Sequence, residues 1–321
     1  MLLLLLVALP AAVFAQALND QDNGPLTGIF GFPNSMEGAT LADAGRNAWN
    51  VSSMLSSHAI IQQTADERLQ FDGQTTRLAL TYRRGISDRL ELGIELPYLW
   101  HEYGNLDSFI DGWHDFFGLP NGVRTLQPQD QIEFSYADAA GEQLGLSRSV
   151  NGVGDLRLLG GWRLAGSGDS STALRFNIKL PTGDSARLLG SGGTDFSIGI
   201  AGDYESLWGM QRLSGFYRLS GTRLGTPDIL RDRYRRFVAR VSGGVGYRLN
   251  DVMTIRAQVT LRSAAFDSGI GALGNNAAML AFGADFRLSE KYALAIGVIE
   301  DINVTTAPDV TFTVTLDRRG T

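Results

Sequence analysis

After residue 45 the chain consists of short segments in which apolar and polar residues alternate one by one, joined in turn by short turns and longer loops. In nearly every segment one face is free of charge, while the other carries Arg, Lys, Asp or Glu. An uncharged outer face around a charged interior suits a closed β-barrel in lipid, where every backbone polar group must be paired within the wall. The pattern therefore predicts an all-β fold, a transmembrane antiparallel up-and-down β-barrel.

The alternation predicts about twelve strands, an even number as in single-chain bacterial barrels. The segment 90–100 shows it most clearly, with Leu and Ile on one face and Glu91 and Glu95 on the other. The expected strands cover 46–57, 68–83, 89–101, 153–165, 172–181, 194–205, 211–223, 236–249, 252–263, 277–288, 291–302 and 309–318.

Loop lengths and aromatic residues support the same architecture. With the N-terminus in the periplasm, the short junctions fall on the periplasmic side, and the outer side receives most of the longer loops, including 58–67 and 102–152. This asymmetry and aromatic girdles at the strand ends are typical of outer-membrane barrels, whereas a secreted soluble β-sandwich, the rival fold, predicts neither. The girdle residues on the periplasmic side are Trp49, Tyr82, Trp162, Tyr204, Tyr247, Phe286 and Tyr292.

Three regions are expected along the chain: a signal peptide over 1–17, an irregular segment over 18–45, and the barrel over 46–321. The apolar start is too short for a membrane-spanning helix, and Ala15-Gln16-Ala17 has the small-x-small form of a cleavage site, although no Lys or Arg precedes it. The 18–45 segment either plugs the barrel or trails in the periplasm, and Phe30 and Phe32 favour insertion because they would be awkward in water. We therefore expect export to the bacterial outer membrane.

Composition narrows the classes of partner. The chain has no cysteine, which excludes a lipoprotein anchor, disulfides and thiolate metal sites. Its net charge of −6 argues against binding nucleic acid. The expected partners are outer-membrane lipid, the barrel-assembly machinery and a small amphipathic solute, and no cofactor or metal is expected.

The long loop contains a helix candidate at 105–120. Phe109, Trp113 and Phe117 fall at helical spacing on one face, so they can pack on the barrel rim or fold into its mouth. Acidic residues at 107, 111 and 115 lie on another face beside His114. A solvated acidic face is the plain interpretation of these residues, and a cation site is the alternative.

Charged residues of the strands point into the barrel by parity. They are interpreted as salt bridges that hold the cylinder, or as a lining that selects anionic or amphipathic solutes. Because both signs are mixed, the first interpretation is favoured. The candidates are Glu91, Glu95, His101, Arg157, Arg175, Lys179, Asp195, Arg240, Arg256 and Asp285.

The sequence contains few of the residues and motifs that enzymatic catalysis requires. The chain has three histidines and lacks a Cys nucleophile, a Gly-x-Ser-x-Gly elbow, an HExxH motif and a phosphate-binding glycine loop. A membrane-embedded lipid hydrolase would need a Ser and a His near the outer rim, and His101 is the candidate base. No catalytic residue is assigned.

Several motifs resemble those of a bacterial family of unknown function, the DUF3187 proteins. They are residues 106–124 (LDSFIDGWHDFFGLPNGVR), Gly154-Asp155, 180–184 (LPTGD), 190–195 (GSGGTD) and 300–302 (EDI). The resemblance covers nearly the whole mature chain and implies an outer-membrane barrel without an assigned activity. The KLPTGD element is also similar to one in hydrophobic-compound porins. Unlike most such barrels, the chain does not end on an aromatic residue, since its last one is Phe312.

Together these observations predict a narrow channel or binding barrel for a small amphipathic or hydrophobic solute. An outer-membrane lipid hydrolase and a structural barrel without a transported ligand are the alternatives.

Overall fold

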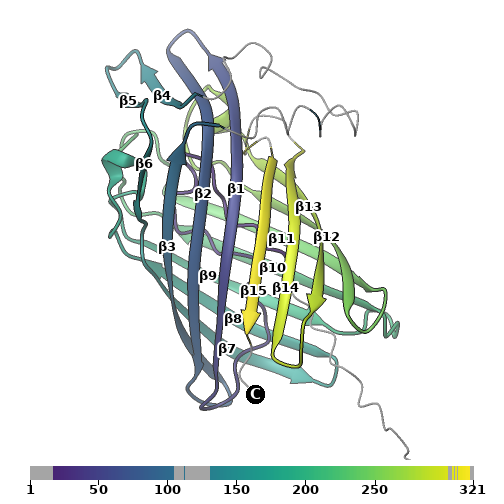
Figure 1. Cartoon of the computed structure of the whole chain (residues 1–321). Helices are drawn as coiled ribbons and strands as arrows, with labels where there is room; N and C mark the ends of the chain where they lie inside the picture. Colours follow the sequence, from purple (N-terminus) through teal and green to yellow (C-terminus); the bar gives the residue numbers. More distant parts are fainter. Residues whose placement is uncertain are drawn as a thin grey trace, which may run out of the picture.

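Twelve long strands close into one antiparallel barrel in the computed structural model, which describes residues 17–104, 112, 131–302, 306, 308 and 310–318 (Figure 1). Each strand pairs with its neighbours in chain order, and β1 pairs with β15 from Trp49–Arg318 to Ser57–Val310, which closes the wall. The predicted fold is confirmed. The barrel strands are β1 (Asn47–Gln63), β2 (Glu67–Gly85), β3 (Leu90–Glu102), β7 (Arg157–Ser167), β8 (Ser170–Lys179), β9 (Asp195–Tyr204), β10 (Leu213–Arg223), β11 (Phe237–Arg248), β12 (Met253–Arg262), β13 (Ala277–Arg287), β14 (Tyr292–Asp301) and β15 (Val310–Arg318).

The two ends of the barrel differ, as the loop lengths predict. At one end, here the short-turn end, hairpins such as 249–252 and 288–291 join the strands. At the other, the long-loop end, the connections include 103–156, 180–194 and 263–276. The four-residue helix α2 (Gly271–Gly274) lies in one of these loops. The predicted loop helix at 105–120 lies outside the described residues, apart from Gly112.

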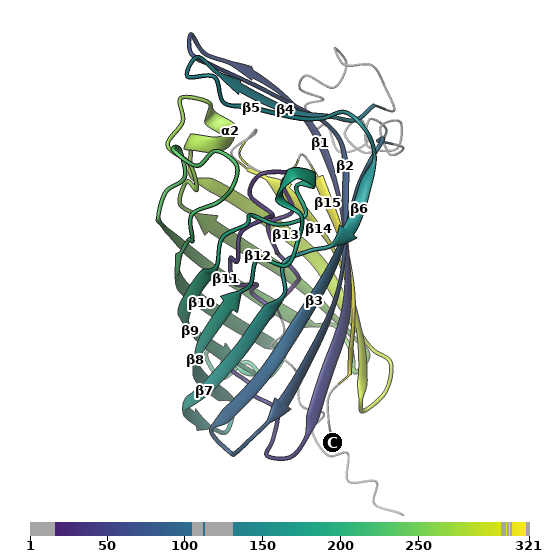
Figure 2. The ribbon, with the colours of Figure 1, turned by 90° about the vertical axis from the view of Figure 1, so that its left-hand side faces the viewer.

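Three short strands lie at the long-loop end, where the first two of them rise above the rim (Figure 2). They are β4 (Glu133–Asp138), β5 (Gln143–Leu146) and β6 (Val150–Val153). The β4 strand pairs with the outer part of β2, from Glu67 to Asp72, and β6 pairs with the outer end of β3. The prediction of a loop at 58–67 was therefore wrong. The first two strands continue to a tight turn at 64–66, because β4 covers them above the rim.

The outer surface of the wall is apolar. Leu80, Ile94, Ile198 and Val259 project from the middle of their strands and are exposed, as a face in contact with lipid requires. Around the short-turn end, Tyr82, Trp162, Tyr204, Tyr247 and Tyr292 are also exposed. In the described part of the chain, no helix has the length and apolarity needed to cross a membrane.

Residues 17–45, here called the inner segment, run through the interior of the barrel (the purple trace in Figure 2). The segment contains no strand, and its link to the wall ladder is a single bridge between Ala44 and Gly85. Most of its residues are buried, among them Asp20, Phe30 and Phe32. The interior is therefore filled by a chain that is not part of the wall.

Replacing Val259 by Arg tests the apolar outer face. Val259 lies in the middle of β12, 41% exposed, so an arginine there should destabilise the barrel by about 2–4 kcal/mol in lipid. Leu249→Arg is the matched control, since Leu249 is also 41% exposed but lies in the β11–β12 turn, where the cost should be about 0–1 kcal/mol. Urea unfolding in lipid vesicles measures both. An equal loss of unfolding free energy at the two positions would contradict a bilayer around the middle of the wall.

Candidate functional site: the filled barrel interior

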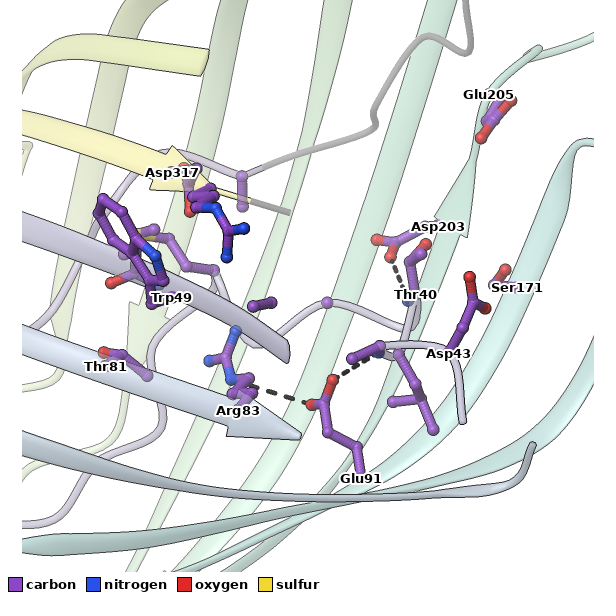
Figure 3. A pocket seen from close by; sticks show the side chains of 18 of the residues that line it. Thr40, Asp43, Trp49, Thr81, Arg83, Glu91, Ser171, Asp203, Glu205 and Asp317 are labelled. Atoms are coloured by element: carbon purple, nitrogen blue, oxygen red, sulfur yellow. Dashed lines mark hydrogen bonds and ion pairs between the residues drawn. The ribbon is translucent and has the colours of Figure 1, made fainter. Parts of the chain in front are cut away.

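A cavity of about 300 Å³ opens inside the barrel at the short-turn end (Figure 3). Wall carboxylates here accept hydrogen bonds from backbone N–H groups of the inner segment. The Ala42 nitrogen lies 2.6 Å from Glu91 Oε2, and the Ala39 nitrogen lies 2.6 Å from Asp203 Oδ2. The same Asp203 oxygen accepts from the Thr40 nitrogen at 3.1 Å. The inner segment therefore forms one side of this cavity.

Deeper in the lumen, three wall arginines pair with three acids of the inner segment. The contacts are Arg157 Nη2–Glu37 Oε1 at 2.9 Å, Arg240 Nη2–Asp20 Oδ2 at 2.8 Å, and Arg262 Nε–Asp22 Oδ2 at 2.9 Å. All six side chains are almost completely buried. Removing one partner of such a pair leaves an uncompensated buried charge, which costs about 3–5 kcal/mol. These pairs therefore hold the segment in place.

Other interior charges pair within the wall itself. Glu95 binds Arg77 at 2.7 Å and Arg157 at 3.3 Å, so it joins three strands. Similar pairs are Arg175–Glu91 at 2.7 Å, Arg218–Asp203 at 2.6 Å, and Arg256–Asp285.

Lys179 ties the loops of the long-loop end to the inner segment. Its ammonium contacts Asp155 and lies 3.6 Å from Asp195. Asp195 in turn accepts from the backbone nitrogens of Gly31 and Gly225, both at 2.8 Å. A Cβ at Gly31 would come within 2.8 Å of the Lys179 side chain, so this close approach requires glycine. The sequence motifs that contain or adjoin Asp155, Lys179 and Asp195 thus meet at one point.

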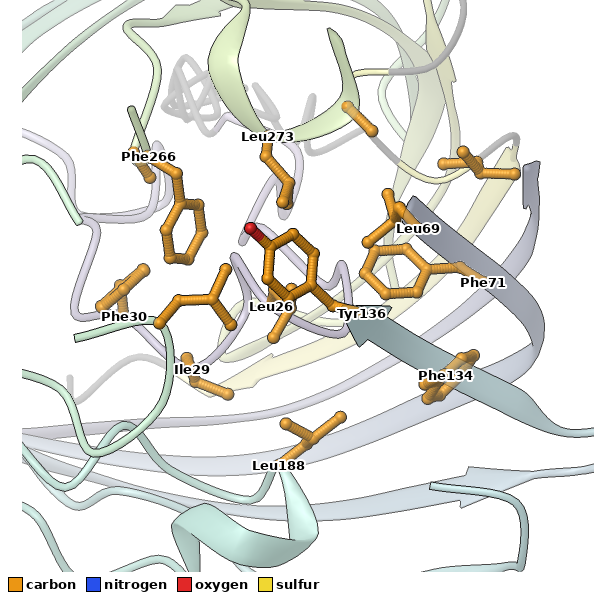
Figure 4. Close-up of a cluster of buried hydrophobic side chains, with 14 of the residues drawn as sticks. Leu26, Ile29, Phe30, Leu69, Phe71, Phe134, Tyr136, Leu188, Phe266 and Leu273 are labelled. Carbon is orange, nitrogen blue, oxygen red and sulfur yellow. The ribbon is translucent and has the colours of Figure 1, made fainter. Parts of the chain in front are cut away.

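Towards the long-loop end the lumen is apolar (Figure 4). The inner segment contributes Leu26, Ile29, Phe30 and Phe32, and Phe30 lies 5.5 Å from the ring of Phe266. The loops and the short strands cover these residues from above. These elements contribute Phe134, Tyr136, Leu188, Leu224, Leu230, Phe266 and Leu273, and the outer part of β2 contributes Phe71.

Glu67 connects the elements that cover this end. Its carboxylate accepts from Tyr136 Oη at 2.8 Å, Ser268 Oγ at 2.8 Å and the Gly269 nitrogen at 2.7 Å, and it lies 3.2 Å from Arg233 Nη1. Burial, together with the hydrogen bond to Glu67, raises the pKa of the Tyr136 phenol, so Tyr136 remains the donor at neutral pH. One buried carboxylate therefore joins β4 and two long loops to the end of β2.

The structure places the charged candidates from the sequence inside the barrel. Glu91, Glu95, Arg157, Arg175, Lys179, Asp195, Arg240 and Arg256 are buried on the inner face, and Asp285 lies partly buried beside Arg256. The loop candidates Phe109, Trp113, His114 and Phe117 lie outside the described residues.

His101 is buried and engaged in a structural network. Its Nε2 donates to the Leu188 carbonyl oxygen at 3.1 Å, because a carbonyl can only accept. Nδ1 is then free to accept from the Thr75 hydroxyl at 3.0 Å, and Thr75 also contacts His58. This arrangement links β2 and β3 to the 180–194 loop, and among the described residues the hydrogen-bond partners of His101 are Thr75 and Leu188 rather than a serine.

The acids of the inner segment, Asp20, Asp22 and Glu37, were not among the sequence candidates. A signal for them was present, because residues 16–45 contain four acids and no Lys or Arg. Such a segment complements a wall rich in arginine. Among the described residues, no group of three or more His, Cys, Asp or Glu could hold a metal ion.

A family model described as protein of unknown function (DUF3187) matches residues 7–319. No curated protein matches the chain. The COG4313 outer membrane channel from Pseudomonas putida F1 is similar in structure, with a TM-score of 0.56 and 13% identity over 86% of this chain and 95% of that one. The NanC porin has a TM-score of 0.47 and 11% identity, covering 84% and 99%. The toluene transporter TodX of P. putida has a TM-score of 0.40 and 9% identity, covering 85% and 90%.

Replacing Glu67 by Gln tests whether this carboxylate holds the long-loop end closed. Loss of the charge weakens its bonds to Arg233 and Tyr136, so the free energy of local opening should fall by about 1–3 kcal/mol. Amide hydrogen exchange in 133–146 and 263–276 should then be roughly tenfold faster or more. The control is Asp66→Asn, which changes an exposed neighbouring acid. Unchanged exchange in the Glu67 variant would show that closure has another cause.

Proposed function

This chain belongs to the DUF3187 family, and we propose that it serves in the bacterial outer membrane as a narrow channel or binding barrel for a small amphipathic or hydrophobic solute. In this proposal residues 1–17 are the cleaved signal peptide, 18–45 the plug and 46–321 the barrel. The apolar outer wall and the contrast between the two barrel ends support a location in that membrane.

The observation that carries the proposal is the inner segment. It occupies the lumen through ion pairs and hydrogen bonds, while the strand ladder closes without it. Polar contacts of this kind exchange with water when the segment moves, whereas the wall pairing stays intact. The segment can therefore leave the lumen without unfolding the barrel, which is what a plug requires.

The chemistry of the lumen supports an amphipathic solute. An apolar cluster lies towards the long-loop end, a charged layer follows, and a cavity opens at the short-turn end. In a molecule with one apolar and one polar part, the apolar part would match the apolar cluster and the polar part would match the charged layer. The hydrolase alternative gains no support from the surroundings of His101.

Neutralising the three acids of the inner segment should open the channel. In planar bilayers, the variant Asp20→Asn, Asp22→Asn, Glu37→Gln should show at least tenfold more open events than the unaltered protein, because each lost charge-assisted bond is worth about 1.5–3 kcal/mol. Asp43→Asn is the matched control, since Asp43 is an exposed acid of the same segment.

A reversible engineered disulfide, here called the redox lock, distinguishes movement of the plug from damage to the barrel. Ala39 and Ala201 pack in one small buried cluster, and the chain has no cysteine of its own. With Ala39→Cys and Ala201→Cys added to the neutralised variant, oxidation should close the channel and reduction should reopen it. Equal conductance in the two redox states would rule out the inner segment as the plug.

A further inference from the structure

We propose that Arg240, Gln258, Thr260 and Arg262 form a carboxylate-binding site, and that the solute of this barrel is an amphipathic carboxylate whose head group replaces Asp20 and Asp22. This inference rests on the proposed channel function and names the class of its solute. The four residues lie side by side on β11 and β12, where Arg240 pairs with Arg262 and Ser242 with Thr260 in the strand register.

The site already holds a carboxylate, that of Asp20. Its Oδ2 lies 2.8 Å from Arg240 Nη2, and it accepts from Gln258 Nε2 at 2.9 Å and from Thr260 Oγ1 at 2.6 Å. Three wall side chains from two strands thus converge on one oxygen. Arg262 donates to the neighbouring Asp22 at 2.9 Å.

The wall does not neutralise this patch by itself. Arg240 and Arg262 are directly opposed, and like charges at such positions repel each other. Among the ion pairs of the described residues, the partners of these two arginines all belong to the inner segment, whereas Arg256 on the same strand has Asp285 in the wall. When the segment leaves, the two arginines therefore need another anion.

The guanidinium of Arg240 also has N–H donors available for a further ligand. Its side chain is 3% exposed, yet its Nε and Nη1 have no hydrogen-bond partner among the described residues. A small cavity of about 20 Å³ lies beside it, lined by Ser35 and Ser242 among others. A guanidinium binds a carboxylate most strongly through two parallel N–H bonds, and Asp20 engages only Nη2 of Arg240. A free carboxylate can make the contacts that Asp20 leaves unused.

An apolar path leads away from this site. The Arg262 guanidinium lies 5.3 Å from the ring centroid of Phe32, and Phe32 lies 5.8 Å from Phe30, whose ring contacts Phe266. The head-group site therefore adjoins the apolar cluster, whose members outside the inner segment, such as Phe71 and Phe266, can contact a tail in place of Phe30 and Phe32. The inner segment has the same order of chemistry, with acids at 20 and 22 followed by apolar residues at 26, 29, 30 and 32.

Calorimetric titration of the full-length protein in lipid nanodiscs tests the inference, with empty nanodiscs as blank. The probes are octanoate, octanol and octylammonium, which share a tail and differ in head group. Octanoate should bind at least tenfold more tightly than octanol. Arg240→Gln should remove that preference, so that the ratio of octanoate to octanol affinity falls to about one. Asp20→Asn with Asp22→Asn should strengthen octanoate binding about tenfold or more, because the competing carboxylates are gone.

Arg235→Gln, which removes an arginine 46% exposed outside the lumen, is the control for a general loss of positive charge and should change nothing. Heat-modifiable gel mobility checks that each variant is folded. Equal binding of octanoate and octanol, preferred binding of octylammonium, or weaker octanoate binding in the Asp20/Asp22 variant would each overturn the carboxylate site. The channel proposal would survive these results if the redox lock still controls conductance, and it would fail with equal conductance in both lock states.

Discussion

Closure of the backbone hydrogen-bond ladder is the constraint on which the rest of the structure depends. The pairing of β1 with β15 leaves no open edge in the wall, so each strand can place apolar side chains outside and polar ones inside. Twelve strands enclose more space than side chains of the wall alone fill. The charged residues forced inward must therefore be neutralised by each other or by something placed in the lumen.

The inner segment meets this need in two complementary ways. Wall acids such as Asp195 and Asp203 accept hydrogen bonds from its backbone, and wall arginines such as Arg240 and Arg262 bind its carboxylates. Both types of contact are polar, so the segment is held firmly although its backbone joins the strand ladder at a single bridge, between Ala44 and Gly85. A filled lumen and a wall that closes independently are thus compatible in one chain.

The sequence alone predicts the strands of the wall, but it does not predict which residues pair inside the lumen. Strict alternation along segments such as Leu90–Trp100 reveals the strands, because period-two patterning is a local property. The ion pairs of Asp20 with Arg240 and of Glu37 with Arg157 join residues far apart in the chain, and no local pattern specifies them. The extension of β1 and β2 above the rim was missed for the same reason, since it depends on pairing with β4.

Different interactions hold the inner segment at the two ends of the lumen, and this difference makes the interior asymmetric along the barrel axis. At the long-loop end, apolar packing around Phe30 and Phe266 combines with the buried Glu67 network. At the short-turn end, the segment is held mainly through hydrogen bonds to Glu91 and Asp203 beside a water-accessible cavity. Water competes more readily for the second kind of contact than for the first. The segment should therefore loosen first from the short-turn end, while its aromatic residues remain anchored under the long loops.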